Sequence, residues 1–396
     1  MIGFVLLLAL LTAFPPLATD MYLAAIPHLQ EVWGQPLAVV NLTLVFFFVS
    51  YCVSLLVYGP LSDRFGRKPP LISGLLLFIA AGLLCALSTS IWMLIGARVI
   101  QATGAGAASA ISMAMAKDRL ESGIRERVLS QVSVIMALAP MISPMIGSLI
   151  MEYLSWPWIF VAQAAMGVIA LLGVITTPES HAGGEGDSLR ALVRSYRRVL
   201  VNGRLMGVVA CNALIALPLF SFIAGSSNIY IKGFGMGETV FALFFGANAL
   251  CFMIGSMTCM RFGKRIGTMR MITLGYSGIV AGGLLILLLA ASGSASPLGF
   301  ALPMGIITFS LGLGRPPANN LALDQVRRDA GTASSTMVFS YFICGAMAMF
   351  LVSLNWPDKV IFIGRLSTAA GTAALGLWLL IRKRLVSSRR GNNPAV

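Results

Sequence analysis

Two charged residues, Asp20 and Arg98, lie inside long apolar runs of the sequence, where they could do chemistry. A carboxylate in apolar surroundings costs several kcal/mol unless it is protonated or paired, so it marks a functional site. Asp20 precedes Pro27 by seven residues and Arg98 follows Ser90 by eight, so both lie roughly 10 to 12 Å from one end of their runs. An ion pair or a shared water between the two is therefore allowed if the runs adjoin.

Asp20 is suited to carry a proton, because access to water governs whether a buried carboxyl group is charged. Such a group can load a proton from one side of a membrane and release it to the other. We therefore expect Asp20 and Arg98 to couple proton movement to transport. The alternative is structural: Asp20 could bond a neighbouring helix or cap a break after Pro15 and Pro16.

Other polar side chains in the apolar runs are candidates for binding a substrate, although amides at such positions also serve helix packing. Beside Asp20 and Arg98, these candidates are Tyr22, Asn41, Gln101, Asn212 and Asn248. Arg315 and Arg365 are the remaining cations within the runs. A substrate role for Arg315 stays open, and Arg365 has no assigned role.

No metal or cofactor site is expected. His28 and His181 are far apart in sequence, and a metal site would need several ligands together. All six cysteines lie inside apolar runs without a C-x-x-C pair, which is typical of small packing residues.

The elements that must position these residues are transmembrane helices. Of the 396 residues, 58% are apolar and 11% are charged, whereas a soluble domain carries about a quarter charged residues. The apolar residues form twelve runs of about 20, the length that crosses a bilayer as a helix. The fold class is therefore an all-α membrane protein, with spans expected at 2–27, 37–60, 71–89, 91–116, 128–151, 157–177, 204–230, 238–260, 271–291, 298–322, 332–354 and 359–381.

The connections between these runs alternate in charge. If the amino terminus is cytoplasmic, the inner connections and the tail hold 23 of the 28 Lys and Arg residues, and the outer ones hold only Lys232 and Lys359. By the positive-inside rule both termini face the cytoplasm. Topology thus explains the net charge of +14. A nucleic-acid partner is not expected, because the basic clusters are short connections and form no folded basic surface.

The runs divide into two sets of six. A basic, glycine-rich linker at 178–203 separates a first domain at 1–177 from a second at 204–396, and its basic stretch is suited to the inner membrane surface. G-P-L-S-D-R-F-G-R-K at Gly59 to Lys68 is weakly echoed by G-S-M-T-C-M-R-F-G-K-R at Gly255 to Arg265. Repeated halves favour an alternating-access transporter.

Several motifs resemble those of the major facilitator superfamily, and within it the twelve-span drug:proton antiporters of the Bcr/CflA type. The motifs are G-P-L-S-D-R-F-G-R-K-P-P at Gly59 to Pro70, T-D-M-Y-L-A-A-I-P at Thr19 to Pro27, R-V-I-Q-A-T-G at Arg98 to Gly104, and A-P-M-I-S-P-M-I-G at Ala139 to Gly147. The chain departs from the family patterns at Ala139 and Ala24, where glycine and proline are usual. Thr12 stands where some relatives carry a second acidic residue.

The resemblance implies roles for two further sets of residues and a fold of two six-helix bundles. A charge cluster on the inner face would latch the halves in one conformation; its residues are Gly59, Asp63, Arg64, Gly66 and Arg67. The fifth span would contain a hinge at Pro140, Pro144 and Gly147.

We expect a proton-coupled exporter of small lipophilic, neutral drugs, such as chloramphenicol-like or multidrug cargo, in the bacterial inner membrane, acting as a monomer. The alternative within the same fold is a transporter of a sugar or metabolite, which generally needs more polar anchors than this chain offers. An enzyme is not expected, because the runs contain no histidine and no carboxylate pair. A scaffold role would tolerate Asp20→Asn.

Overall fold

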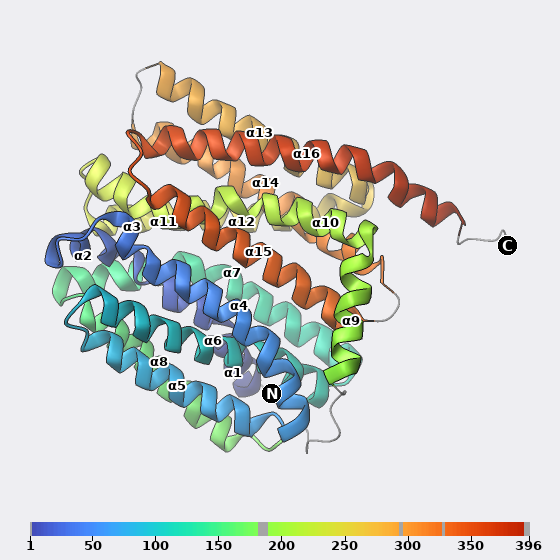
Figure 1. Cartoon of the computed structure of the whole chain (residues 1–396), viewed down its shortest axis with the longest axis horizontal. Helices are drawn as coiled ribbons and strands as arrows, with labels where there is room; N and C mark the ends of the chain where they lie inside the picture. Colours follow the sequence, from blue (N-terminus) through green and yellow to red (C-terminus); the bar gives the residue numbers. More distant parts are fainter. Residues whose placement is uncertain (1, 181–188, 293–295, 327–328, 392–396) are drawn as a thin grey trace. The chain divides into compact units, whose positions relative to one another are not determined.

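The computed structural model describes residues 2–180, 189–292, 296–326 and 329–391, and this part of the chain is helical throughout, with no strand (Figure 1). The first predicted span is broken into three pieces and the second begins with a short separate helix. These and the next four spans are α1 (Ile2–Asp20), η1 (Leu23–Ala25), α2 (Ile26–Val32), α3 (Leu37–Val40), α4 (Leu42–Phe65), α5 (Lys68–Ala86), α6 (Ile91–Arg119), α7 (Ser122–Tyr153) and α8 (Pro157–Thr176).

The second half of the chain contains one helix that is not a span, α9 (Leu189–Val201), followed by the remaining six predicted spans. The seventh span is broken after Leu214 and ends in a π-helical turn. The elements are α10 (Gly203–Leu214), α11 (Ala216–Ser227), η2 (Asn228–Gly233), α12 (Glu238–Ile266), α13 (Thr268–Ala291), α14 (Pro297–Leu323), α15 (Ala330–Ser353) and α16 (Lys359–Gly391).

The chain forms two compact units. The first comprises Met1–Ser188, Ile223–Gly246 and Ser353–Asn355, and the second comprises Leu189–Phe222, Ala247–Val352 and Trp356–Val396. The expected division at 1–177, 178–203 and 204–396 stays a prediction, and residues 181–188 of its linker lie outside the described residues. Arg327 and Arg328, two of the basic residues predicted to lie on the inner side, are also outside the described residues.

Both units contain a helix that packs on two others through glycines. In the first unit α5 lies against α6 and α8, and a Cβ at Gly104 of α6 would overlap the Gly74 carbonyl of α5. In the second unit α13 lies against α14 and α16 (Figure 1), and Gly275 of α13 meets the backbone of Gly314. Only a residue without a side chain allows such close crossings, which are typical of membrane helices.

The weak sequence echo between the halves has a structural counterpart. α4 ends at Gly66 with φ of 85°, and α12 is followed by Gly267 with φ of 89°. L-residues with side chains rarely adopt this left-handed backbone, so each glycine lets the chain leave one long helix and enter the next at once. The second span of each half therefore ends in the same way.

The long helices have the composition and the surface of membrane spans. Eleven described segments are long and apolar enough to cross a bilayer. The fifth of the twelve predicted spans is not among them, although its helix, α7, has 32 residues. Large apolar side chains such as Ile169, Leu302 and Leu380 are exposed on the helices. Burial in lipid accounts for these side chains, so the chain is a multi-pass membrane protein.

The basic helix α9 is fixed within the second unit by Asp329, just before α15. Arg198 donates two hydrogen bonds of 2.8 Å to the Asp329 carboxylate, and Ser195 donates a third. These bonds raise the pKa of Arg198 above its ordinary value. α9 runs across the ends of α10 and α15 (Figure 1) and is thus a docked helix within the segment that the sequence predicted as a linker.

Candidate functional site

The site around Asp20 begins with a break in the first span. Pro15 and Pro16 lie inside α1, and the helix continues through them to end at Asp20. There the Tyr22 amide bonds to the Thr19 carbonyl, three residues back, instead of the Ala18 carbonyl that a regular α-helix would use. The Ala18 carbonyl is therefore free to accept bonds from other helices.

Arg98 of α6 uses this free carbonyl. Its Nη1 donates to the Ala18 oxygen at 3.0 Å and to Gln101 Oε1 at 2.7 Å, and Gln163 Nε2 of α8 donates to the same carbonyl at 3.2 Å. Gln101 in turn donates to Gln163 at 2.9 Å. The Ala18 carbonyl oxygen, which lacks its helical partner at the break, thus connects α1, α6 and α8.

The rest of the Arg98 guanidinium is surrounded by aromatic rings. Its central carbon lies 4.3 Å from the centroid of Phe47, 5.3 Å from Tyr22 and 5.8 Å from Phe160, distances typical of cation–π contacts. Arg98 is fully buried, and its Nε and Nη2 make no hydrogen bond within the described residues. Two of the three guanidinium nitrogens therefore lie among aromatic rings without a hydrogen-bond partner in the described part of the chain.

Asp20 is 5% exposed and accepts a 2.9 Å hydrogen bond from the Thr19 hydroxyl. α1 and α6 adjoin, as an Asp20–Arg98 interaction requires. However, among the described residues no ion pair joins Asp20 to Arg98, and the arginine bonds to the Ala18 carbonyl instead. The carboxyl group is therefore buried two residues after the Ala18 carbonyl that holds Arg98.

Sequence reasoning missed part of this site. Gln163 bridges Gln101 and the Ala18 carbonyl, Thr43 donates to the Tyr22 hydroxyl at 3.1 Å, and Phe47 covers Arg98. The only signal for Gln163 was a lone amide in an otherwise apolar run. Thr43 and Phe47 gave none, because threonine and phenylalanine are common in membrane helices.

The other substrate-binding candidates are engaged in contacts between helices. Asn41 is fully buried and donates to the Ala224 carbonyl at 3.0 Å and to the Ser353 hydroxyl at 2.8 Å, all within the first unit. In the second unit Asn212 donates to Asn319, and Asn248 accepts from Thr308. These bonds suit helix packing, and a substrate role for the three asparagines stays a prediction.

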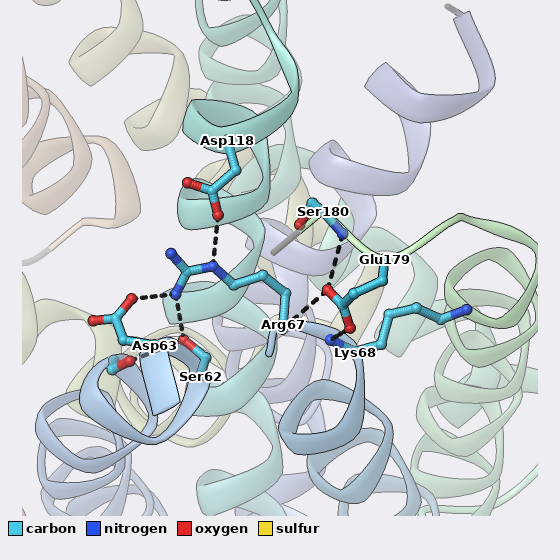
Figure 2. Close-up of polar contacts among 8 residues, drawn as sticks. Ser62, Asp63, Arg67, Lys68, Asp118, Glu179 and Ser180 are labelled. Carbon is cyan, nitrogen blue, oxygen red and sulfur yellow. Dashed lines mark hydrogen bonds and ion pairs between the residues drawn. The ribbon is translucent and has the colours of Figure 1, made fainter. Parts of the chain in front are cut away.

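Two of the predicted latch residues, Asp63 and Arg67, belong to a charge cluster centred on Arg67 (Figure 2). Its guanidinium donates to Asp118 of α6 at 2.7 Å, to the Ser62 hydroxyl at 2.9 Å and to Asp63. The Glu179 carboxylate accepts from the amides of Arg67 and Lys68, at the start of α5, where a negative charge is favourable. The cluster connects α4, α5, α6 and the segment that follows α8.

The remaining latch residues contribute differently. Gly66 supplies the left-handed turn that aims Arg67 back toward α4, Gly59 has open space around it, and Arg64 is exposed with its guanidinium over Phe65. Burial lowers the pKa of Arg67, and the bonds and charges of Asp118 and Asp63 outweigh it, so the pKa is raised overall. Arg67 therefore stays charged across the usual pH range.

Asp118→Asn is expected to destabilise the chain more than Asp63→Asn does. The Asp118 side chain is 19% exposed and that of Asp63 is 56% exposed, so water screens the Asp63 pair more strongly. Loss of the Asp118 charge leaves a buried guanidinium with a weaker partner and costs about 1 to 3 kcal/mol. Thermal unfolding of the two variants in the same detergent measures the difference, and equal midpoints would contradict this ranking.

The predicted hinge residues lie in α7, which is continuous through Pro140 and Pro144. Gly147 lies directly against Met21, in the turn after Asp20, and a Cβ there would overlap the Met21 backbone. Each proline removes one helical hydrogen bond, so this stretch of α7 is easier to bend. α7 therefore contacts the turn next to Asp20 through a residue that has to be small.

No described group of three or more His, Cys, Asp or Glu residues could hold a metal ion. The arrangement instead offers one buried carboxyl group, one buried cation and aromatic walls. This set can exchange a proton and contact an apolar molecule, which is chemistry suited to transport.

Known proteins with a similar sequence or fold include drug-resistance proteins and a proton symporter. The chain is 27% identical to the chloramphenicol resistance protein of Pseudomonas aeruginosa, over 90% of this chain and 86% of the relative, and 28% identical to the multidrug resistance protein MdtL of Escherichia fergusonii, over 88% and 86%. The solved D-xylose-proton symporter has the same fold, with a TM-score of 0.74 at 16% identity over 95% of this chain and 97% of the symporter. The model of the Major Facilitator Superfamily matches residues 8–349, so the chain belongs to that family of transporters.

Proposed function

We propose that the chain is a proton-coupled exporter of small lipophilic drugs that works by alternating access. The observation that carries the proposal is the buried Asp20, placed at the break in the first span, two residues after the Ala18 carbonyl to which Arg98 donates. Such a carboxyl group can bind a proton when water reaches it from one side and release it when water reaches it from the other.

The relatives support the choice of cargo. Two relatives that match most of the chain are named for chloramphenicol and multidrug resistance, and the match covers 86% of each relative. The side chains that contact the Arg98 guanidinium are aromatic rings, and such rings suit a flat apolar molecule better than a sugar.

The orientation proposed is that of a bacterial inner-membrane protein with both termini in the cytoplasm, acting as a monomer. The bias of Lys and Arg toward one set of connections supports it. Contacts within the first unit fit the same topology. Glu31 pairs with Lys232 at 3.2 Å and Glu152 accepts from Thr239, and all four residues fall at the outer side in this orientation.

The function is tested in proteoliposomes that contain the purified chain. An inside-acidic pH gradient should drive chloramphenicol into the vesicles, and dissipating the gradient with a proton carrier should stop accumulation. A panel of toxic compounds in an efflux-deficient host then defines the cargo range. Gradient-driven flux of a sugar or metabolite, with no response to any drug of the panel, would contradict the proposal.

A further inference from the structure

Arg315 lies well inside α14 but does not face the lipid. Leu298, Leu302 and Ile306 are exposed at intervals of four residues, which makes one apolar stripe along the helix. Arg315 follows Ile306 by nine residues, about two and a half turns, and therefore points to the opposite side of α14. Its side is that of the buried Thr308 and Leu311, yet Arg315 itself is half-buried.

The guanidinium of Arg315 lies over a cluster of aromatic rings, which we call the aromatic platform and define as Phe220, Tyr341 and Phe342. Its central carbon is 3.6 Å from the centroid of the Tyr341 ring. Phe220 and Phe342 meet that ring edge to face at 5.5 and 5.7 Å. Gly345 allows this packing, because a Cβ there would lie 2.6 Å from the Phe220 ring. The close contact with the Tyr341 ring restricts the movement of the guanidinium.

The donors of this cluster are not used. Within the described residues Arg315 makes no ion pair and no side-chain hydrogen bond, and the Tyr341 hydroxyl, on a residue that is 3% exposed, also lacks a partner. A cation–π contact leaves all five N–H groups of a guanidinium free. Arginine held in a plane with free donors is the arrangement that binds a carboxylate through two parallel bonds.

We propose that Arg315 and Tyr341 bind the carboxylate of an acidic aromatic drug, whose apolar part contacts the aromatic platform at its half-buried member, Phe342. This inference rests on the proposed function and adds aryl carboxylates to its neutral lipophilic cargo. A lipid phosphate has related chemistry, but the position of Arg315 opposite the exposed stripe of α14 favours the cargo.

The test uses two probes of equal shape, 4-nitrobenzoate and 4-nitrobenzamide, and measures their binding to the full chain in phosphatidylcholine nanodiscs. The wild type should bind the acid at least tenfold more tightly than the amide. Arg315→Gln should remove this preference and leave amide binding within threefold. Arg365→Gln is the matched control, because Arg365 is an exposed arginine of another membrane helix in the same unit, and it should keep the preference.

Tyr341→Phe keeps the platform and removes the hydroxyl, so it should weaken acid binding about fivefold without changing amide binding; it provides a second test if Arg315→Gln does not fold. Equal binding of the two probes by the wild type, including no binding of either, would overturn the proposal. So would a preference that persists in Arg315→Gln.

Nanodiscs with phosphatidylglycerol distinguish the two sources of the anion. If that lipid abolishes the acid preference, the cluster is a lipid site and the cargo assignment is wrong. An intact preference in a chain that exports no drug would instead contradict only the proposed function.

Discussion

Asp20→Asn is expected to abolish gradient-driven drug export and to leave drug binding within about threefold of the wild type. Asparagine has the shape of aspartate and can still accept the Thr19 bond, but it cannot take up or release a proton. Because no second acidic residue is found in the first span, the variant has no substitute proton carrier there. The measurement is drug flux into proteoliposomes under an imposed pH gradient.

Asp20→Glu provides the matched control, since it keeps a titratable carboxyl group and should retain part of the flux. Exchange of one proton for one neutral drug moves one charge, so a potential of 100 mV adds about 2.3 kcal/mol, or about fiftyfold in accumulation. That voltage effect should disappear with Asp20→Asn. A variant that accumulates drug as well as the wild type does would remove Asp20 from the coupling mechanism.

The helices were predictable from the sequence because the bilayer sets their length. Each predicted span corresponds to a long helix or to a broken one, and the ends mostly differ by a few residues. The carboxyl-terminal end of α12 continues to Ile266, beyond the apolar run, because helical hydrogen bonds extend into water while hydropathy marks only the lipid-exposed part.

The hydrogen-bond partners of side chains inside the membrane helices were less predictable, because they depend on which helices adjoin. Depth placed Asp20 and Arg98 at one level, but no pattern indicated that Arg98 would bond to the Ala18 carbonyl. That bond follows from the Tyr22 amide turning to Thr19, a local backbone choice that residue types alone do not determine. Asn212 was a candidate for its residue type, and its partner Asn319 is over a hundred residues away.

The charge cluster around Arg67 was more predictable, because a local motif determines part of its geometry. Gly66 and Arg67 lie in one short connection, and a glycine with positive φ there turns the arginine toward Asp63 four residues earlier. The motif did not predict Asp118 or Glu179, which come from α6 and from beyond α8. A motif thus specifies contacts within its own segment and leaves its distant partners to the fold.

Gly147→Ala should lower stability by about 1 to 3 kcal/mol and reduce export at least tenfold, although it adds a single methyl group. The new Cβ would overlap the backbone of Met21, and backbone cannot rotate away as a long side chain can. α7 and the turn after Asp20 must then separate, which disturbs the carbonyl that holds Arg98. Export in proteoliposomes and thermal unfolding in detergent report the two effects.

Gly96→Ala is the control for this substitution. Gly96 lies in α6, two residues before Arg98, and a Cβ there meets nothing within 4 Å. Alanine is the better helix former by about 1 kcal/mol, so Gly96→Ala should keep export and stabilise the chain slightly. The two variants change the same residue type by the same methyl group, so opposite signs of the stability change isolate the contact with Met21. If both variants behave alike, α7 does not position the turn that carries Asp20.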